Sequence, residues 1–281
     1  KQRFFNHLLI GMKGPTLVGA IEQNLADRHA VVVQIVSTNE AILDRRLAEI
    51  PASERDDLTI DITPRECILD YLVNSFPTQL HTVVADEDGN LTSIPAVDER
   101  GNPIESREAV EARDRMVEQL CALPAVPGAL DQLLHHFGHD QVAEVTGRSK
   151  RVLRSGDRLF VENRPASANL GETQAFMDDR KRILVFSDAG GTGRSYHADL
   201  GVKNQRRRVH YLLEAGWRAD QAIQGLGRSH RTNQRSAPLF RPVTTNVKGE
   251  RRFISTIARR LDSLGALTRG QRQTGGQNLF R

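Results

Sequence analysis

Two arginines, Arg228 and Arg231, are the residues of this sequence best suited to bind phosphate. A guanidinium offers a planar fork of donors that matches phosphate oxygens, and it stays charged at any working pH. On a helix spanning Gln224–Gln234, the three-residue spacing places both arginines on one face. Two neighbouring guanidiniums repel each other unless an anion separates them, and Gly225 and Gly227 let another surface approach closely. We interpret the stretch as a phosphate-binding helix, with a solvated basic surface as the alternative.

Two predicted strands end in segments that also suit phosphate. The β-branched run 30–36 is typical of a strand buried on both faces, and it ends in Ser37 and Thr38 at the expected start of a helix. A second buried strand, 182–187, runs into a glycine-rich turn at 188–195. Free N–H groups at helix N-termini bind phosphate well. We expect these strand ends, the turn and the arginine stretch to surround one nucleotide.

The glycine-rich turn has another interpretation, an S-adenosylmethionine site. Asp188 would open the turn, and Glu214 at the end of the next strand would bind the ribose. However, too few residues follow Glu214 for the further strands that a methyltransferase sheet needs. Such an enzyme also gives the arginine stretch no role, so the methyltransferase ranks as a third alternative.

The remaining pattern predicts an α/β domain. At least five apolar runs alternate with amphipathic segments, which is typical of a parallel sheet with helices on both faces. Pro15 suits the first turn of a helix, and Asn169 with Glu172 matches a capping box. The expected strands are 30–36, 142–147, 182–187, 209–213 and 239–243, with a short hairpin at 152–154 and 159–163. The expected helices are 1–28, 37–47, 64–76, 105–120, 130–137, 169–179 and 244–264.

Residues 77–127 differ in composition and are predicted to be an insert. The near-copies Asp86–Asn90 and Asp98–Asn102 flank an apolar run, which predicts a β-hairpin or arm with two turns. The first copy resembles the start of a calcium loop, but Leu91 and Val97 stand where glycine and glutamate are required. Calcium binding is therefore excluded.

Charge is distributed unevenly along the chain. The net charge of +4 comes from 39 basic and 35 acidic residues, but residues 180–281 hold 21 basic against 6 acidic residues. This asymmetry points to a polyanion partner for the second half, with attraction between the two halves as the alternative. Residues 246–281 are expected to be a C-terminal helical extension of one domain. No apolar run is long enough to span a membrane, and Cys67 and Cys121 are expected to be reduced core residues.

Four segments resemble, in order, the motifs of the second RecA-like domain of superfamily 2 helicases. They are Ser37–Thr38, Thr146–Gly147, Ser187–Ser195 and Gln224–Gln234. The form Gln-x-x-x-Arg-x-His-Arg-x-x-Gln is closest to the Swi/Snf-type remodelling ATPases. Longer strings are similar to the strawberry notch family, and the resemblance covers nearly the whole chain: 142–148, 186–200, 203–210, 227–234 and 259–268.

The resemblance implies a role for each matching residue. Arg231 would be an arginine finger at the γ-phosphoryl group of ATP, with Arg228 as its companion, and Gln224 would position their helix across the cleft. Gly193 and Ser195 would line the nucleotide. Residues at strand ends would contact nucleic-acid phosphates: Ser37, Thr38, Thr146, Arg148 and Ser187. His210 and His230 are expected to pack or form hydrogen bonds, and no metal ligands are expected.

Two motifs of such ATPases are missing, because the sequence has no Gly-x-x-x-x-Gly-Lys-Ser/Thr and no Asp-Glu-x-His. The resemblance implies that the phosphate cradle and the main Mg²⁺ ligand belong to an N-terminal RecA-like domain outside this chain. We expect the C-terminal half of an ATPase or helicase that acts on DNA, with RNA not excluded, and that is inactive alone. It would be cytoplasmic in bacteria or phage and nuclear in eukaryotes. The alternative is a non-catalytic RecA-like scaffold that binds nucleic acid or protein.

Overall fold

The computed structural model describes most of the chain, in two compact units. The described residues are 2–36, 38, 40, 44, 47–48, 51, 53, 64–85, 89–122, 128–155, 158–191, 193–214, 219–245, 255–257 and 259. The first unit combines Lys1–Ile60 with Pro127–Arg281, and the second is Asp61–Val126. The predicted extension at 246–281 and the predicted helix at 37–47 lie largely outside the described residues.

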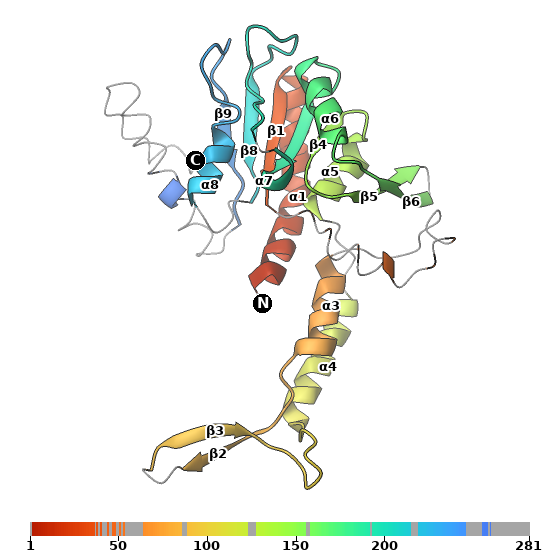
Figure 1. Cartoon of the computed structure of the whole chain (residues 1–281), viewed down its shortest axis with the longest axis vertical. Coiled ribbons are helices and arrows are strands. Elements are labelled where there is room, and N and C mark those ends of the chain that lie inside the picture. The colour runs from red at the N-terminus through yellow and green to blue at the C-terminus, as the bar shows by residue number, and fades with distance from the viewer. Residues whose placement is uncertain are drawn as a thin grey trace. The chain divides into compact units, whose positions relative to one another are not determined.

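The first unit is built on a five-stranded parallel sheet (Figure 1). Its strands lie in the order β4-β7-β1-β8-β9. They are β1 (Ala30–Ile35), β4 (Val142–Val145), β7 (Ile183–Ser187), β8 (Arg208–Leu212) and β9 (Leu239–Pro242). In the central strand β1 all six residues are buried, and Val33 pairs with both Val185 and Tyr211. The parallel α/β fold predicted from the sequence is confirmed.

Helices cover both faces of this sheet, because successive strand residues point to opposite sides. On one face, α1 (Gln2–Ala26) and α5 (Ala129–Phe137) pack against alternate apolar strand residues. On the other face, α6 (Ala168–Met177) packs on β4 and β7, and α8 (Ala219–Leu226) packs on β8. The predicted hairpin is also present, as β5 (Lys150–Ser155) paired with β6 (Arg158–Asn163). The glycine-rich turn begins with a single helical turn, α7 (Asp188–Gly191).

Two local predictions about the helices are wrong. Pro15 lies in the middle of α1 and not near its first turn. Asn169 lies inside α6, whose N-cap residue is Ser167, so it does not cap the helix. Its side chain instead donates to the carbonyl of Thr146 at 2.8 Å. In the part of the chain that is described, no helix combines the length and apolar character needed to cross a membrane.

The described residues of the second unit form two helices and a β-ribbon. α3 (Pro64–Ser75) packs against α4 (Arg107–Cys121), and β2 (His81–Ala85) pairs antiparallel with β3 (Leu91–Pro95). The hairpin predicted from its two turn sequences is therefore present. The unit includes α3, which precedes the predicted insert 77–127 in the sequence.

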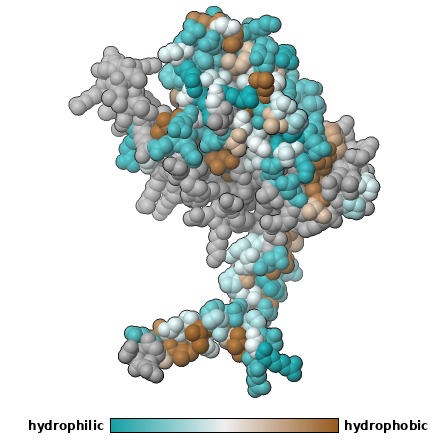
Figure 2. All heavy atoms as spheres, in the orientation of Figure 1, coloured by the Kyte–Doolittle hydropathy of each residue, from teal (hydrophilic) through white to brown (hydrophobic). Residues whose placement is uncertain are grey.

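Many residues of the second unit are exposed to solvent. Every residue of both ribbon strands is exposed, including Val83 at 64% and Leu91 at 76%, and Figure 2 shows apolar surface on the ribbon. No residue of α4 is buried, and this helix corresponds to the one predicted at 105–120. For the same reason Cys121, at the end of α4, is exposed and is not the core residue that we predicted.

Candidate functional site

The carboxyl ends of the parallel strands form one edge of the sheet. Thr146 follows β4, and Ser187 ends the neighbouring strand β7. The loops after these strands touch, since a Cβ added to Gly190 would lie 2.4 Å from the Thr146 backbone. A Cβ added to Gly147 would lie 2.8 Å from that of Ala189, so glycine is needed at both positions. Open α/β sheets bind their ligands at this edge.

Arg228 joins the arginine stretch to the glycine-rich turn. Its guanidinium carbon lies 5.5 Å from the ring centroid of Phe186, at the end of β7. Arg228 Nη1 donates to the carbonyl of Arg194 at 3.4 Å, and the Arg228 carbonyl accepts from the backbone N–H of Tyr196 at 2.7 Å. The side chain is thus half-buried over the strand end.

Two polar atoms of this cluster lack hydrogen-bond partners among the described residues. They are Arg228 Nε and the hydroxyl of Tyr196, whose ring lies 5.1 Å from that of Phe186. Burial raises the pKa of Tyr196 to about 12, although Arg228 and Arg194 oppose the rise, so the phenol keeps its proton. Buried polar groups are nearly always hydrogen-bonded in folded proteins. An acceptor atom that reached these donors would be stabilised, and of the two side chains Arg228 is half-buried whereas Tyr196 is fully buried.

The arginine stretch is not a single helix, which corrects the sequence prediction. α8 ends at Leu226, and the N–H groups of Arg228 and Ser229 bond to carbonyls three residues earlier, as in a tight turn. The two glycines at 225 and 227 explain this end, because glycine is the least favourable helix residue after proline. Arg228 consequently lies half-buried, whereas Arg231 is exposed.

The other predicted nucleotide-binding residues lie near the surface. Gly193 is exposed with a φ of 74°, a conformation that favours glycine. Ser195 is half-buried, and Gln224 is exposed on the last turn of α8. Within the described ranges, no three His, Cys, Asp or Glu side chains gather where they could hold a metal ion.

The predicted nucleic-acid contacts at the ends of β1 and β7 differ in exposure. Thr38 is half-buried, and Ser37 lies outside the described residues. Ser187 is buried, and its hydroxyl has no partner in the described part of the chain.

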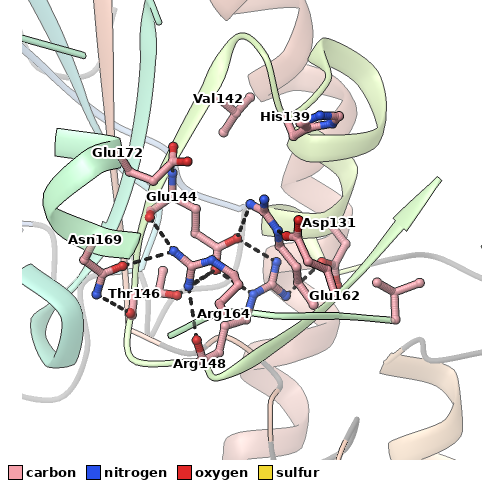
Figure 3. A network of polar contacts seen from close by, with 12 residues as sticks. Asp131, His139, Val142, Glu144, Thr146, Arg148, Glu162, Arg164, Asn169 and Glu172 are labelled. Atoms are coloured by element: carbon pink, nitrogen blue, oxygen red, sulfur yellow. Dashed lines mark hydrogen bonds and ion pairs between the residues drawn. The ribbon is translucent and has the colours of Figure 1, made fainter. Parts of the chain in front are cut away.

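Thr146 and Arg148, the other two predicted contacts, lie in a buried network around Glu144 (Figure 3). The Glu144 carboxylate accepts from Thr146 Oγ1 at 2.7 Å and from Arg148 Nε at 2.6 Å. Arg148 also donates to Asp131 at 2.9 Å, and its side chain is only 2% exposed. Contrary to the prediction, this guanidinium is not free to bind a backbone phosphate.

Two further arginines complete the network. Arg151 Nη1 lies 3.4 Å from Glu144 Oε2 and donates through Nε to Glu162, and Arg164 Nη1 lies 3.3 Å from Glu144 Oε1. Three arginines thus face three carboxylates, so their formal charges cancel. The network joins β4 to α5 and to the β5–β6 hairpin, which fixes the strand end that carries Thr146.

The pKa values of the network follow from burial and charge. Burial by itself raises the pKa of Glu144, but the arginines and the Thr146 hydroxyl outweigh it and hold the pKa below its ordinary value. Burial lowers the pKa of Arg164, helped by repulsion from Arg151 and Arg148. Glu144 and Arg164 nevertheless remain charged near neutral pH, as a balanced pairing of buried charges requires.

A second buried polar group lies beneath the arginine stretch, and the sequence predicted a hydrogen-bonding role only for its histidine. His210 of β8 is fully buried between Ser229 and Gln34 of β1. Its Nδ1 lies 2.5 Å from Ser229 Oγ, and its Nε2 lies 3.2 Å from Gln34 Oε1. His210 is therefore a hydrogen-bonding histidine, as predicted. A polar residue within a predicted buried strand is the signal that could have identified Gln34.

Part of the basic second half is internal. Arg208 is 1% exposed, with Nε donating to the carbonyl of Tyr196 at 2.8 Å and Nη1 to Asn204 at 2.9 Å. Arg206 pairs with Asp179 at 2.8 Å. The number of basic residues in the sequence therefore overstates the positive charge that faces solvent.

His210 should make stability depend on pH. Burial lowers the pKa of His210 from 6.5 to about 3. His210 binds a proton near pH 6.5 in the unfolded chain but not in the folded chain. Above pH 6.5 the imidazole is neutral in both states, so its titration costs the folded state no stability. Below pH 6.5 the folded state loses about 1.4 kcal/mol of stability per pH unit as the pH falls towards 3. We expect the urea midpoint to fall between about pH 7 and pH 5, and to fall less in His210→Asn. Equal pH slopes for the two proteins would contradict this expectation.

Comparison with known proteins identifies relatives for much of the chain. Residues 128–281 match the family described as the C-terminal domain on strawberry notch homologues. The Drosophila melanogaster protein strawberry notch is 47% identical over 168 residues, covering 57% of this chain and 10% of that protein. Mouse strawberry notch homolog 2 is 33% identical over 348 aligned residues, covering 97% of this chain and 26% of that protein. Arabidopsis thaliana FORGETTER 1 is 41% identical over 176 residues, covering 59% of this chain and 14% of that protein.

Proposed function

The chain belongs to the strawberry notch family as its C-terminal helicase-type domain, and from this premise we propose that it is the C-terminal half of a nucleic-acid-dependent ATPase. The chain spans 10–26% of the length of the three relatives described above, so the activity of the whole protein is part of the proposal. The phosphate cradle and the Mg²⁺ ligands would come from an N-terminal RecA-like domain of the same protein. This chain would supply the groups that complete the site.

The observation that carries the proposal is the position of Arg228. Its half-buried guanidinium lies at the carboxyl edge of the sheet, against the glycine-rich turn, and its Nε has no partner among the described residues. A phosphate oxygen would satisfy this donor, and the neighbouring hydroxyl of Tyr196 is a second unmet donor. Arg231, three residues later, is exposed and able to reach a group outside this domain.

In this proposal each arginine has a separate role. ATP would supply the phosphoryl group that is transferred to water. Arg228 would bind phosphate oxygens from a fixed position, and Arg231 would act as the finger that neutralises charge on the γ-phosphoryl group. Gly193, Ser195 and Gln224 would lie beside the nucleotide.

Nucleic acid would contact the strand ends on the same domain. Ser37, Thr38 and Ser187 remain candidates for hydrogen bonds to backbone phosphates, which position a strand without reading its sequence. Thr146 and Arg148 are left out of this surface, because both side chains are used within the Glu144 network. The proposed partner is DNA. RNA is the alternative partner, and the experiment below compares the two.

The exposed apolar ribbon of the second unit favours a second candidate, a non-catalytic scaffold. Exposed apolar side chains of this kind often mark protein-binding surfaces. A scaffold would need neither arginine for turnover. The methyltransferase alternative loses support, because the Glu214 carboxylate is buried and accepts a hydrogen bond from the N–H of Val36 at 2.6 Å.

ATP turnover separates these candidates. We expect the full-length protein to hydrolyse ATP faster when single-stranded or duplex DNA is added, with RNA measured in parallel. The isolated 281-residue chain should show no turnover above background, because it lacks the phosphate cradle. Absence of turnover in the full-length protein would favour the scaffold, and DNA-stimulated turnover by the isolated chain would contradict the proposed division of roles.

A further inference from the structure

Three polar side chains are buried between the sheet and the end of α8. Gln34 is 3% exposed, His210 0% and Ser229 1%, and they come from β1, β8 and the arginine stretch. Burying polar groups is costly unless they are hydrogen-bonded to one another or to the backbone. A core of apolar side chains would stabilise the same interface without this constraint. The group therefore calls for an explanation beyond packing.

The donor and the acceptor of each hydrogen bond in this group can be assigned. Gln34 Nε2 donates to the carbonyl of Ala222 in α8 at 3.3 Å, which leaves Gln34 Oε1 as the acceptor facing His210. Neutral histidine carries one N–H, so Nε2–H donates to Gln34 and Nδ1 is left as an acceptor. The Ser229 hydroxyl then donates to Nδ1, 2.5 Å away, in preference to the more distant carbonyl of Leu226 at 3.3 Å. One carbonyl of α8 thus sets the orientation of every member.

The group also fixes where α8 lies on the sheet. A Cβ added to Gly225 would fall 2.0 Å from Gln34 Nε2, so the helix backbone rests directly on that amide. The ring centroid of His210 lies 5.7 Å from that of Phe240 in β9, and the ring centroid of His230 lies 6.4 Å from that of the same phenyl ring. The end of α8 at Gly225 and the residues Ser229 and His230 therefore contact side chains of the sheet.

We infer that Gln34, His210 and Ser229 are positioning residues for the arginine finger, a role that rests on the proposed function. Ser229 lies between Arg228 and Arg231 in the sequence, and its hydroxyl is hydrogen-bonded to His210 of the sheet. Arg228 has further contacts with Phe186 and Arg194, whereas Arg231 is exposed and depends on the turn for its position. A misplacement of about 1 Å at a reacting group can cost about 10²-fold in rate.

The test uses Ser229→Ala in the full-length protein, the smallest change that removes the hydroxyl donor. We expect nucleic-acid-stimulated kcat to fall about 10- to 100-fold, with KM for ATP and nucleic-acid affinity within about twofold of wild type. His210→Asn, whose amide can still accept from Ser229, should keep most of the activity. Ser236→Ala is the matched control, since Ser236 Oγ has no hydrogen bond to the described residues and should have little effect.

Repeating the Ser229→Ala change in a protein that lacks the Arg231 side chain distinguishes positioning of Arg231 from general destabilisation of the fold. In an Arg231→Ala protein, Ser229→Ala should cause no further loss of turnover, because it acts through the missing side chain. Equal losses in both backgrounds would overturn the inference, as would near-normal kcat in Ser229→Ala. Thermal melting and the stoichiometry of nucleic-acid binding report the folded fraction of each variant. If wild-type protein shows no turnover at all, the proposed function fails and the inference fails with it, whereas an active wild type with an unaffected variant refutes the inference alone.

Discussion

Replacing Arg231 with lysine in the full-length protein is expected to lower nucleic-acid-stimulated ATP turnover by roughly 10³-fold or more. Arginine fingers contribute about 10³–10⁵ in rate because they neutralise charge that spreads over the γ-phosphoryl oxygens in the transition state. Lysine keeps the charge but loses the planar fork that binds two oxygens at once. A residue that merely adds positive charge to the surface would tolerate this exchange.

The same experiment must show that nucleic-acid affinity survives the Arg231→Lys change at one salt concentration. Arg235→Lys is a matched control, because Arg235 is also exposed and donates to Gln205 at 2.9 Å, away from the turn at Arg228. Near-normal turnover in Arg231→Lys would remove the finger from the proposal. A parallel loss of affinity and turnover would instead make Arg231 a nucleic-acid contact.

The structure gives a new reason for assigning separate roles to Arg228 and Arg231. From spacing alone, both arginines were expected on one face of a helix. The helix ends at Leu226, so Arg228 is held against Phe186 while Arg231 is exposed. A fixed arginine suits binding of a ground-state phosphate, and an exposed one suits a group that meets its target only when two domains close.

The fold was predictable because its signals are local. β-branched apolar runs such as 30–36 and 182–187 correspond to β1 and β7 of the sheet, and the turn sequences around Leu91 correspond to the ribbon. The end of α8 was also encoded locally, in Gly225 and Gly227. There, the helical spacing of the arginines was given more weight than the low helix propensity of glycine.

The partners of the polar residues were not predictable, since they are set by tertiary contacts. The resemblance implies a phosphate contact for Arg148, but its charge is balanced by Glu144 and by Asp131, which lies 17 residues away on another element. Ser229 reaches His210 only because α8 folds back onto β8. A single sequence shows which polar residues fall within buried strands, as Glu144 does, but not which side chains satisfy them.

Replacing Glu144 with glutamine is expected to destabilise the first unit by about 3–5 kcal/mol at neutral pH. The change removes the one carboxylate shared by Arg148, Arg151 and Arg164 while keeping nearly the same shape. A complete buried ion network adds little net stability, because desolvation offsets the attraction. An incomplete network is costly, because buried guanidiniums are left without their counter-charge.

Urea unfolding of the chain near pH 7 measures this loss, and Glu162→Gln is the matched control. Glu162 is 39% exposed and contacts one arginine, Arg151, so its loss should cost about 1 kcal/mol or less. The pKa of Glu144 is held below its ordinary value of 4.5, so its charge stabilises the fold above pH 4.5 and is lost as acid protonates the folded carboxylate. The gap between wild type and Glu144→Gln should therefore narrow as the pH falls below 4.5. A loss as small as that of Glu162→Gln, or a gap unchanged by acid, would show that the arginines find other partners and that Glu144 does not hold this edge of the sheet together.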